Sequence, residues 1–193
     1  MGKHSRVVVF LAVFSLILSF TSTDAAAAAM YTVTDLGTLG GAHSYASGIN
    51  DSGQVVGYAG DASGQYRAFL WDQATGMTDL GTLVGAEDSD ACGINNVGQV
   101  VGFAFLNASE QEHAFLWDSA TGMVDLGTLG GSDSGAYGIN DSGQVVGYAC
   151  NAANQNRAFL WDSSGGMTDL GTLGGDFSDA RGINDSGQVV GSA

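Results

Sequence analysis

The chain has 193 residues, with 20 Asp and Glu against five Lys and Arg, which gives a formal net charge of −15. Nucleic-acid binding relies on Lys and Arg that displace counterions from phosphates, and anionic membranes also repel an acidic surface. The composition therefore argues against nucleic acid and anionic lipid as partners.

The N-terminus has the layout of a secretory signal peptide. Lys3 and Arg6 form a basic start, an apolar run follows over residues 7–20, and alanines fill residues 25–29. The apolar run is shorter than the ~20 residues that a membrane-spanning helix needs. We therefore expect residues 1–29 to be removed, with no membrane insertion of the remainder; an uncleaved anchor is the alternative. This predicts a secreted, extracellular protein, with the periplasm and the cell surface as alternatives.

Residues 30–193 are expected to form a single domain built from a repeat of about 45 residues. Three short sequences recur in one order, which is a stronger signal than any one of them alone. Gly-Ile-Asn begins at positions 48, 93, 138 and 182; Asp-Leu-Gly-Thr-Leu begins at positions 35, 79, 125 and 169; Ala-Phe-Leu-Trp-Asp begins at positions 68, 114 and 158. The repeat units are approximately residues 48–92, 93–137 and 138–181, with a partial unit over residues 182–193.

Each unit is predicted to contain four β-strands. In the first unit, residues 48–59 form two strands around a turn at residues 50–53, where Asn favours the first position and Gly accepts a positive φ at the last. Aromatic and branched side chains at residues 68–71 indicate the third strand, and residues 77–83 are expected to form the fourth. A helix is a poor alternative, because each interior glycine costs a helix ~1 kcal/mol relative to alanine.

Four strands in about 45 residues match the size of a propeller blade. Val55 and Val56 are adjacent and apolar, as are Phe69 and Leu70, which indicates strands buried on both faces between stacked sheets. We therefore expect an all-β repeat protein that is β-propeller-like, with about four four-stranded blades, the last of them incomplete. A β-solenoid is the alternative.

The strand order also predicts which element the last blade lacks. Counted from Tyr31, the sequence offers one isolated fourth strand, three full sets and a final hairpin, so the third strand of the last blade is missing. An open strand edge invites pairing with another chain. The sequence thus predicts an open or strained ring, or self-association through the open end.

A structural signature recurs along the chain: an Asn and a Gly in the first turn, and Trp-Asp at the end of the third strand. The Trp side chains are expected to pack between blades, and the Asp side chains to anchor the following turn. The signature residues are Asn50, Gly53, Trp71, Asp72, Asn95, Gly98, Trp117, Asp118, Asn140, Gly143, Trp161, Asp162, Asn184 and Gly187.

The sequence predicts no catalytic residue, cofactor site or metal site. His43 and His113 occupy different repeat positions, and the spacing brings neither of them to a nucleophile and an acid. The acidic cluster of Glu87, Asp88 and Asp90 occurs once, which leaves weak Ca²⁺ binding as an alternative to a solvated loop.

Cys92 and Cys150 also occupy different repeat positions. Export permits a disulfide between them, and bridging needs Cα atoms within ~7 Å of each other. The other interpretation is two small apolar core residues. The sequence leaves both open.

Three motifs resemble those of a known family: His-Ala-Phe-Leu-Trp-Asp beginning at His113, Asp-Leu-Gly-Thr-Leu-Gly-Gly, and Gly-Ile-Asn-Asp-Ser-Gly-Gln-Val-Val-Gly. They are similar to the HAF repeat family of extracellular bacterial proteins, and the resemblance covers nearly all of residues 31–193. It implies export and a repetitive β architecture, and it implies no assigned activity. The chain departs from the family pattern at Arg67 and Arg157, which replace the His, and at Asn96, which replaces an Asp.

The segments that vary between units join the second and third strands, at residues 60–66, 105–112 and 150–156. Loops on a rigid scaffold commonly carry binding residues. The leading hypothesis is therefore a secreted, non-enzymatic scaffold that binds an unknown extracellular ligand or protein. The alternatives are a propeller-type glycan-active enzyme, which needs two acids facing a central funnel, and a structural or remnant array without a ligand of its own.

Overall fold

The computed structural model describes residues 8–12, 31–106 and 111–193. All regular elements in these ranges are β-strands, and each repeat forms an antiparallel sheet whose strands follow one another in chain order. The first sheet contains β3 (Gly40–Ile49), β4 (Val55–Asp61), β5 (Tyr66–Asp72) and β6 (Gly76–Asp79). The second contains β7 (Asp88–Ile94), β8 (Val100–Leu106), β9 (Gln111–Asp118) and β10 (Gly122–Gly127). The third contains β11 (Gly130–Ile139), β12 (Val145–Asn151), β13 (Asn156–Asp162) and β14 (Gly166–Asp169).

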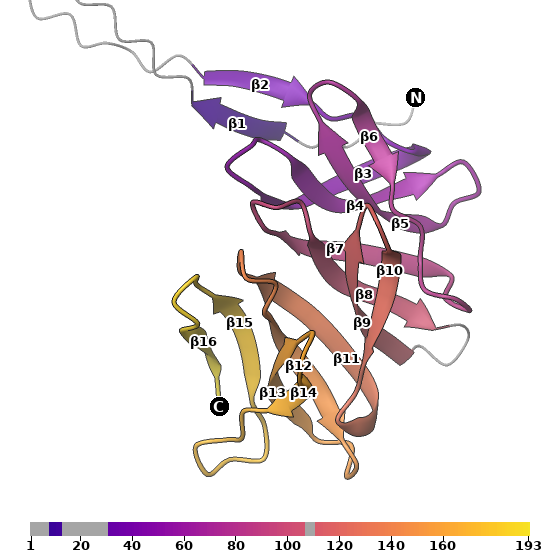
Figure 1. The fold of residues 1–193 in the computed structure, drawn as a ribbon. Coiled ribbons are helices and arrows are strands. Elements are labelled where there is room, and N and C mark those ends of the chain that lie inside the picture. The colour runs from indigo at the N-terminus through magenta and orange to yellow at the C-terminus, as the bar shows by residue number, and fades with distance from the viewer. Residues whose placement is uncertain (1–7, 13–30, 107–110) are drawn as a thin grey trace, which may run out of the picture.

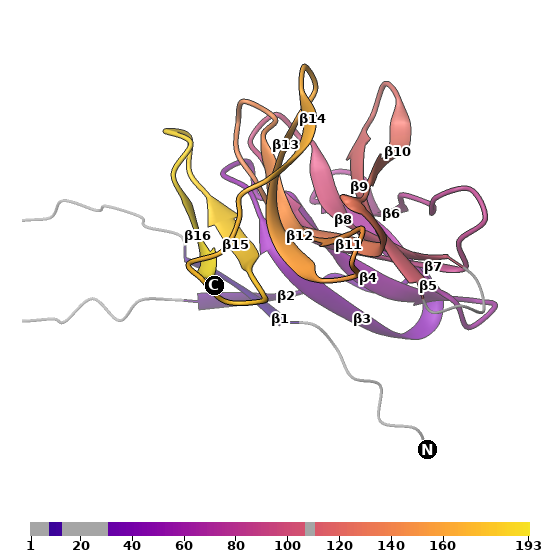
Figure 2. The ribbon, with the colours of Figure 1, turned by 90° about the horizontal axis from the view of Figure 1, so that it is seen from below.

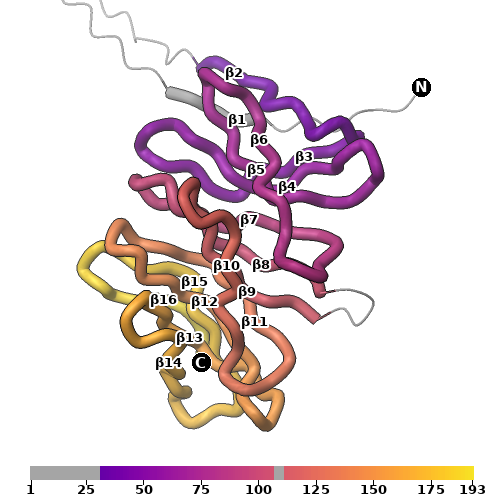
Figure 3. Tube along the Cα trace, turned by 45° about the vertical axis from the view of Figure 1, so that its right-hand side comes forward, coloured from indigo at the N-terminus to yellow at the C-terminus, as the bar shows by residue number. Residues whose placement is uncertain are grey.

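A final hairpin of β15 (Asp179–Ile183) and β16 (Val189–Ser192) follows the third sheet. Figure 1 shows the three sheets and then this hairpin following one another in chain order, and Figure 3 shows the first sheet at one end of the trace and the third sheet at the other. The view from below in Figure 2 shows the strands of each sheet side by side. The predicted all-β, blade-like repeat is confirmed: the described strands form separate antiparallel sheets, and each sheet packs against the next one in chain order.

The first strand of each sheet begins before the Gly-Ile-Asn that opens the predicted unit, at Gly40 rather than Gly48 in the first sheet, so the sheets are offset from the predicted units. Strand pairing stays within each sheet. This distinguishes the fold from a solenoid, in which successive coils stack along shared sheets.

A search of the described residues for a helix that could span a membrane finds none.

Most of the predicted signal peptide lies outside the described residues. Its described part, β1 (Val8–Ala12), pairs antiparallel with β2 (Tyr31–Asp35), with Val9 opposite Thr34. In the first sheet, β5 pairs with β6 in the same register, with Leu70 opposite Thr78. Strand β1 therefore occupies the place of a third strand beside β2. Removal of residues 1–29 stays a prediction.

The first turn forms as the sequence predicts. Asn50 N donates to Gln54 O (3.1 Å), Gly53 N donates to Asn50 O (3.0 Å), and Gly53 has a φ of 78°. The side-chain oxygen of Asn50 also accepts hydrogen bonds from the backbone N–H groups of Ser52 and Gln54. These bonds explain why Asn and Gly recur at these two positions.

The fourth strand is shorter than predicted. We expected residues 77–83 to be extended, whereas β6 ends at Asp79. Gly81 adopts a φ of 76° and its N–H donates to the Asp79 carboxylate (2.7 Å), so the chain turns there. Leu80 and Leu83, on either side of the turn, are both buried between sheets. The Asp-Leu-Gly-Thr-Leu motif is therefore a strand end followed by a linker that places two leucines in the core.

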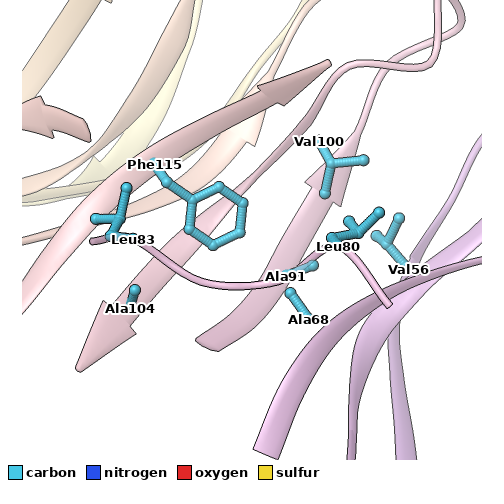
Figure 4. Packing of buried hydrophobic residues seen from close by; sticks show 8 residues of the cluster. All are labelled: Val56, Ala68, Leu80, Leu83, Ala91, Val100, Ala104 and Phe115. Atoms are coloured by element: carbon cyan, nitrogen blue, oxygen red, sulfur yellow. The ribbon is translucent and has the colours of Figure 1, made fainter. Parts of the chain in front are cut away.

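The hydrophobic core is divided among the interfaces between successive sheets. Between the first and second sheets, the fully buried Phe115 belongs to a cluster with Val56 and Leu80, shown in Figure 4. Phe159 holds the same repeat position between the second and third sheets, where it packs with Val101. Burying each such side chain contributes about 1.5–3 kcal/mol. Most of the stabilisation of one repeat therefore comes from its neighbours.

A buried serine that the sequence reasoning missed also joins neighbouring sheets. Ser89 Oγ accepts a hydrogen bond from Ala68 N (2.9 Å) and donates one to Gly81 O (2.6 Å). Ser134 and Ser178 make the same pair of bonds in the next two repeats. The signal was available, because a serine stands four residues before every Gly-Ile-Asn.

A ladder of asparagine side chains connects the first turns of all the repeats. Asn50 Nδ2 donates to Asn95 O (3.1 Å), Asn95 Nδ2 to Asn140 O (3.0 Å), and Asn140 Nδ2 to Asn184 O (3.1 Å). The turns must approach closely for this, and a Cβ atom on Gly93 would lie 3.1 Å from a carbonyl oxygen of the next repeat. A Cβ atom two residues before Asn50, Asn95 or Asn140 would therefore crowd the next repeat, whereas one on Gly182, before the last asparagine of the ladder, would make only an ordinary contact.

Replacing a central asparagine of this ladder is expected to destabilise the protein. Asn95→Ala removes the bond to the next repeat and leaves buried backbone groups of the turn unpaired, which should cost about 2–3 kcal/mol. Asn184→Ala, at the exposed end of the ladder, is the matched control and should cost about 1 kcal/mol or less. Urea unfolding of both variants measures the difference, and equal losses would argue against the ladder.

Candidate binding groove

An aromatic cluster covers part of one face of the first sheet. Tyr45 on β3 and Tyr58 on β4 are cross-strand partners whose rings stack with centroids 5.3 Å apart. Tyr66 on β5 meets Tyr58 edge to face at 5.4 Å. Such ring pairs contribute about 0.5–1.5 kcal/mol beyond the area that they bury. Because the three rings stand on adjacent strands, the sheet fixes their positions.

The second sheet presents two further rings. Phe103 and Phe105 are two residues apart on β8, so they point to the same side of the strand. Their rings meet edge to face with centroids 5.4 Å apart.

A groove of about 310 Å³ lies where the rings of the two sheets meet. This volume is at the lower end of the range of small-molecule sites in proteins. The Asp88 carboxylate accepts a hydrogen bond from Tyr66 N (2.6 Å) and so ties the second sheet to the first at this point. The lining residues are Tyr58, Tyr66, Asp88, Asp90, Phe103 and Phe105.

Asp90 is the electrostatically unusual residue of the groove. Its Oδ1 is buried without a hydrogen-bond partner, and no other buried side-chain N or O atom in the described ranges is in that state. Burial, and then the nearby Glu112, raises the pKa of Asp90 to about 7. An unpaired buried charge is costly. Near neutral pH, the groove therefore holds a carboxyl group balanced between its protonated and charged forms.

Acidic groups continue from the groove toward the third sheet. Burial raises the pKa of Glu112, and Asp133 raises it further. Burial, and then Asp90, raises the pKa of Cys92 to about 12, so that side chain stays a neutral thiol. Cys92 and Cys150 are both free. The structure therefore contains no bridge between them.

The signature residues have structural positions, and none of them lines this groove. The side chains of Trp71, Trp117 and Trp161 are partly buried against the core clusters, as expected. The following aspartates hold the next turn, with Asp72 accepting a hydrogen bond from Ala74 N (2.8 Å). Asp118 and Asp162 make equivalent bonds.

The groove combines residues that the sequence pointed to with residues that it did not. Tyr66 and Phe105 belong to the variable segments, and Asp88 and Asp90 to the acidic cluster. Tyr58 and Phe103 lie on strands and were not singled out, although they hold the same repeat position, which Tyr148 occupies in the third sheet. Residues 107–110 of the second variable segment lie outside the described residues.

The two histidines of the repeat domain belong to different sheets. His113 Nδ1 lies 2.9 Å from Asp125 Oδ2, and His43 is exposed on β3. In the part of the chain that the structure describes, no three or more His, Cys, Asp or Glu side chains are grouped to hold a metal ion. Weak Ca²⁺ binding stays a prediction.

Comparison of the sequence with protein-family models and with curated proteins gives no match. The resemblance to the HAF repeat family therefore rests on the motifs quoted above, and the function has to be argued from the groove itself.

Replacing Asp90 with a neutral isostere should stabilise the protein at high pH. The pKa of Asp90 is raised in the folded state, so its protonation favours folding at low pH, and this contribution is lost as the pH rises through about 7. This loss accumulates between the ordinary aspartate pKa of 3.8 and about 7, so the stability advantage of Asp90→Asn over the wild type should be larger at pH 8 than at pH 5, by on the order of 1–3 kcal/mol. Urea unfolding at both pH values measures this, with the exposed Glu87→Gln as the charge-matched control. A gain that does not change with pH would contradict the assignment.

Proposed function

We propose that the chain is a secreted, non-enzymatic interaction scaffold that binds an extracellular ligand in the groove between the first and second sheets. Export is supported by the predicted signal peptide and by the resemblance to extracellular repeat proteins. Binding is supported by one observation above all, namely that a single groove is lined by four aromatic rings from two sheets and by a carboxylate, Asp90, with one buried oxygen that has no hydrogen-bond partner. Side chains held on strands need little further ordering when a ligand binds.

The arrangement of the acids favours recognition over the glycan-active alternative. Glycoside hydrolysis places two carboxyl groups on opposite sides of the scissile bond. Asp88 and Asp90 lie on the same strand, β7, and the facing wall of the groove is aromatic.

Removing one ring of the groove is expected to weaken ligand binding. The secreted protein is screened on glycan and peptide arrays, and the affinity for each ligand found is then measured in solution. Phe103→Leu should lower that affinity by about 3–10-fold, since an aromatic contact is worth ~0.5–1.5 kcal/mol. Val97→Ala, at an exposed turn outside the groove, should leave it unchanged. Arrays without any ligand, or equal affinities for both variants, would refute the proposed site.

Self-association is the second role that we propose, because the final hairpin exposes the surface that earlier repeats bury. Val101 and Val146 are fully buried, whereas Val190 at the same repeat position is 66% exposed. Leu83 is buried, whereas its equivalent Leu173 is 92% exposed. The hairpin thus carries an apolar face of the kind that packs against a further repeat elsewhere in the chain.

The apolar face of the final hairpin also contains a cavity. It measures about 290 Å³ and is lined by Ala158, Leu170, Leu173, Ala180 and Val189, among others. The equivalents of these five residues surround Phe115 between the first two sheets. The cavity therefore lies where the phenylalanine of a third strand would pack.

The first sheet offers a complementary face. A groove of about 610 Å³ there is lined by Ile49, Val55 and Trp71 of the sheet and by polar turn residues, with Thr34 and Leu36 from β2 and the residues after it on its other side. Ile49 is exposed, whereas the equivalent Ile94 packs against a core cluster. A second copy placed head to tail would continue the asparagine ladder, with Asn184 as donor. Contacts of this heterologous kind generate rings or filaments.

A charge on the exposed hairpin face should therefore suppress assembly. We expect the wild-type protein to form larger species as its concentration rises, in sedimentation velocity, and Leu173→Asp to stay monomeric. Val84→Asp, at a fully exposed valine away from both end faces, is the matched control and should assemble like the wild type. A wild-type protein that is monomeric at every concentration would refute this role.

A further inference from the structure

We propose that the groove between the first and second sheets binds a guanidinium group, such as an arginine side chain presented by a partner. This inference rests on the proposed binding function and names the chemistry of its ligand. Asp90 in the groove and Asp179 in the final hairpin hold the same repeat position, and at Asp179 the chain itself supplies a guanidinium group, that of Arg181.

The final hairpin shows how this position is satisfied internally. The segment Ser178-Asp179-Ala180-Arg181-Gly182 aligns with Ser89-Asp90-Ala91-Cys92-Gly93. Asp179 forms a close ion pair with the Arg181 guanidinium, and its other oxygen accepts hydrogen bonds from the backbone and hydroxyl of Ser192. The guanidinium carbon of Arg181 lies 4.4 Å from the ring centroid of Tyr137. One cation is thus held by a carboxylate and an aromatic ring.

Asp90 has neither of the two partners of Asp179, namely the guanidinium of Arg181 and the hydroxyl and N–H of Ser192. Cys92 takes the place of Arg181, and the cross-strand partner of Asp90 is Phe103, where Asp179 has Ser192. The ring cannot donate a hydrogen bond, and Asp90 Oδ1 is left buried and unpaired. The two changes together remove the internal cation and place an aromatic wall beside the carboxylate.

No other basic side chain of the repeat domain fills the groove. Residues 31–193 contain three arginines and no lysine. Arg67 donates to Glu87 O and lies 3.6 Å from the Asp61 carboxylate. Arg157 donates to Asp176 O (2.7 Å). Arg181 is paired with Asp179, and although its charge reaches Cys92, Asp90 Oδ1 stays without a hydrogen-bond partner. Within the described ranges, a cation paired with this oxygen is thus one that another molecule supplies.

The remaining lining of the groove suits such a ligand. The faces of Tyr and Phe rings attract cations, and guanidinium groups stack on them readily. Tyr58, Tyr66, Phe103 and Phe105 supply four rings around the two carboxylates. The net charge of −15 adds a long-range attraction for a positively charged partner.

Binding should depend on pH, because Asp90 must be charged to pair with the ligand. The titratable and charged groups near Asp90 include Asp88 on its own strand, Glu112 on β9, and Tyr58 and Tyr66 across the groove. Cys92 also lies near Asp90, and the charge of Arg181 reaches this thiol. Glu112 opposes ionisation of Asp90, and a bound cation offsets that repulsion. Affinity should therefore fall as the pH drops below about 7.

The test uses N-acetyl-arginine amide as the probe and N-acetyl-citrulline amide as its uncharged isostere. Amide chemical shifts of the full secreted protein are followed by NMR at pH 8 and pH 5. Saturable shifts at Ser89, Asp90 and Phe103 are expected with the arginine probe at pH 8, with at least tenfold weaker binding at pH 5 and none with the citrulline probe. Equal binding of the two probes, or no binding of either, would overturn the proposal.

Two variants of the same protein locate the site. Asp90→Asn, which is expected to fold at least as well as the wild type, should lower the affinity for the arginine probe at least tenfold. Cys92→Arg should place an internal guanidinium beside Asp90, as Arg181 lies beside Asp179, and should both block the probe and raise the melting temperature. Val97→Ala is the control and should bind like the wild type. Unchanged binding in Asp90→Asn or Cys92→Arg would refute the assignment.

The experiments distinguish failure of the guanidinium inference from failure of the proposed binding function. Array ligands that are uncharged and are weakened by Phe103→Leu would uphold the binding function and overturn the guanidinium inference. Arrays without ligands, together with an inert arginine probe, would overturn both.

Discussion

The close approach of the Gly-Ile-Asn turns is the constraint on which the rest of the structure depends. Asparagine side chains donate to the carbonyl oxygen of the next turn, and the glycines two residues before Asn50, Asn95 and Asn140 leave room for this approach because they carry no Cβ atom. This contact sets the distance between successive sheets, and the phenylalanine of each third strand then fills the space between them. The repeat is therefore stabilised mainly by its neighbours, as in other arrays whose units contact only the next unit.

The groove forms where the second repeat differs in sequence from the equivalent positions of the final hairpin. In the final hairpin, Asp179 is neutralised by Arg181 and hydrogen-bonded by Ser192. In the second repeat the same carboxylate faces a cysteine and a phenylalanine, and both changes leave its charge uncompensated. Because the repeat units are nearly identical, Asp179 shows which partners a carboxylate at this position can have, and Asp90 can be compared with it directly. The residues that line the proposed binding groove thus lie at positions outside the recurring signature.

The fold was largely predictable, because its determinants are local. Asn50 and Gly53 define the first turn through bonds within five residues, and paired apolar residues such as Val55 and Val56 predict burial on both faces. The prediction was wrong for the fourth strand, where Gly81 turns the chain and sends Leu80 and Leu83 into the interface between sheets. The bridging role of Ser89 was missed because its partners lie in the preceding sheet.

The sequence by itself determined the repeat and the order of its strands, because turn-forming and apolar residues recur at fixed spacing. It also showed Asp90 as one member of an acidic cluster, without distinguishing it from Glu87 or Asp88. Only the tertiary structure placed Asp90 against the rings of Tyr58 and Phe103 and buried one of its oxygens. Burial and pairing of a charge depend on side chains from other strands and other sheets, and no local pattern in the sequence records that environment.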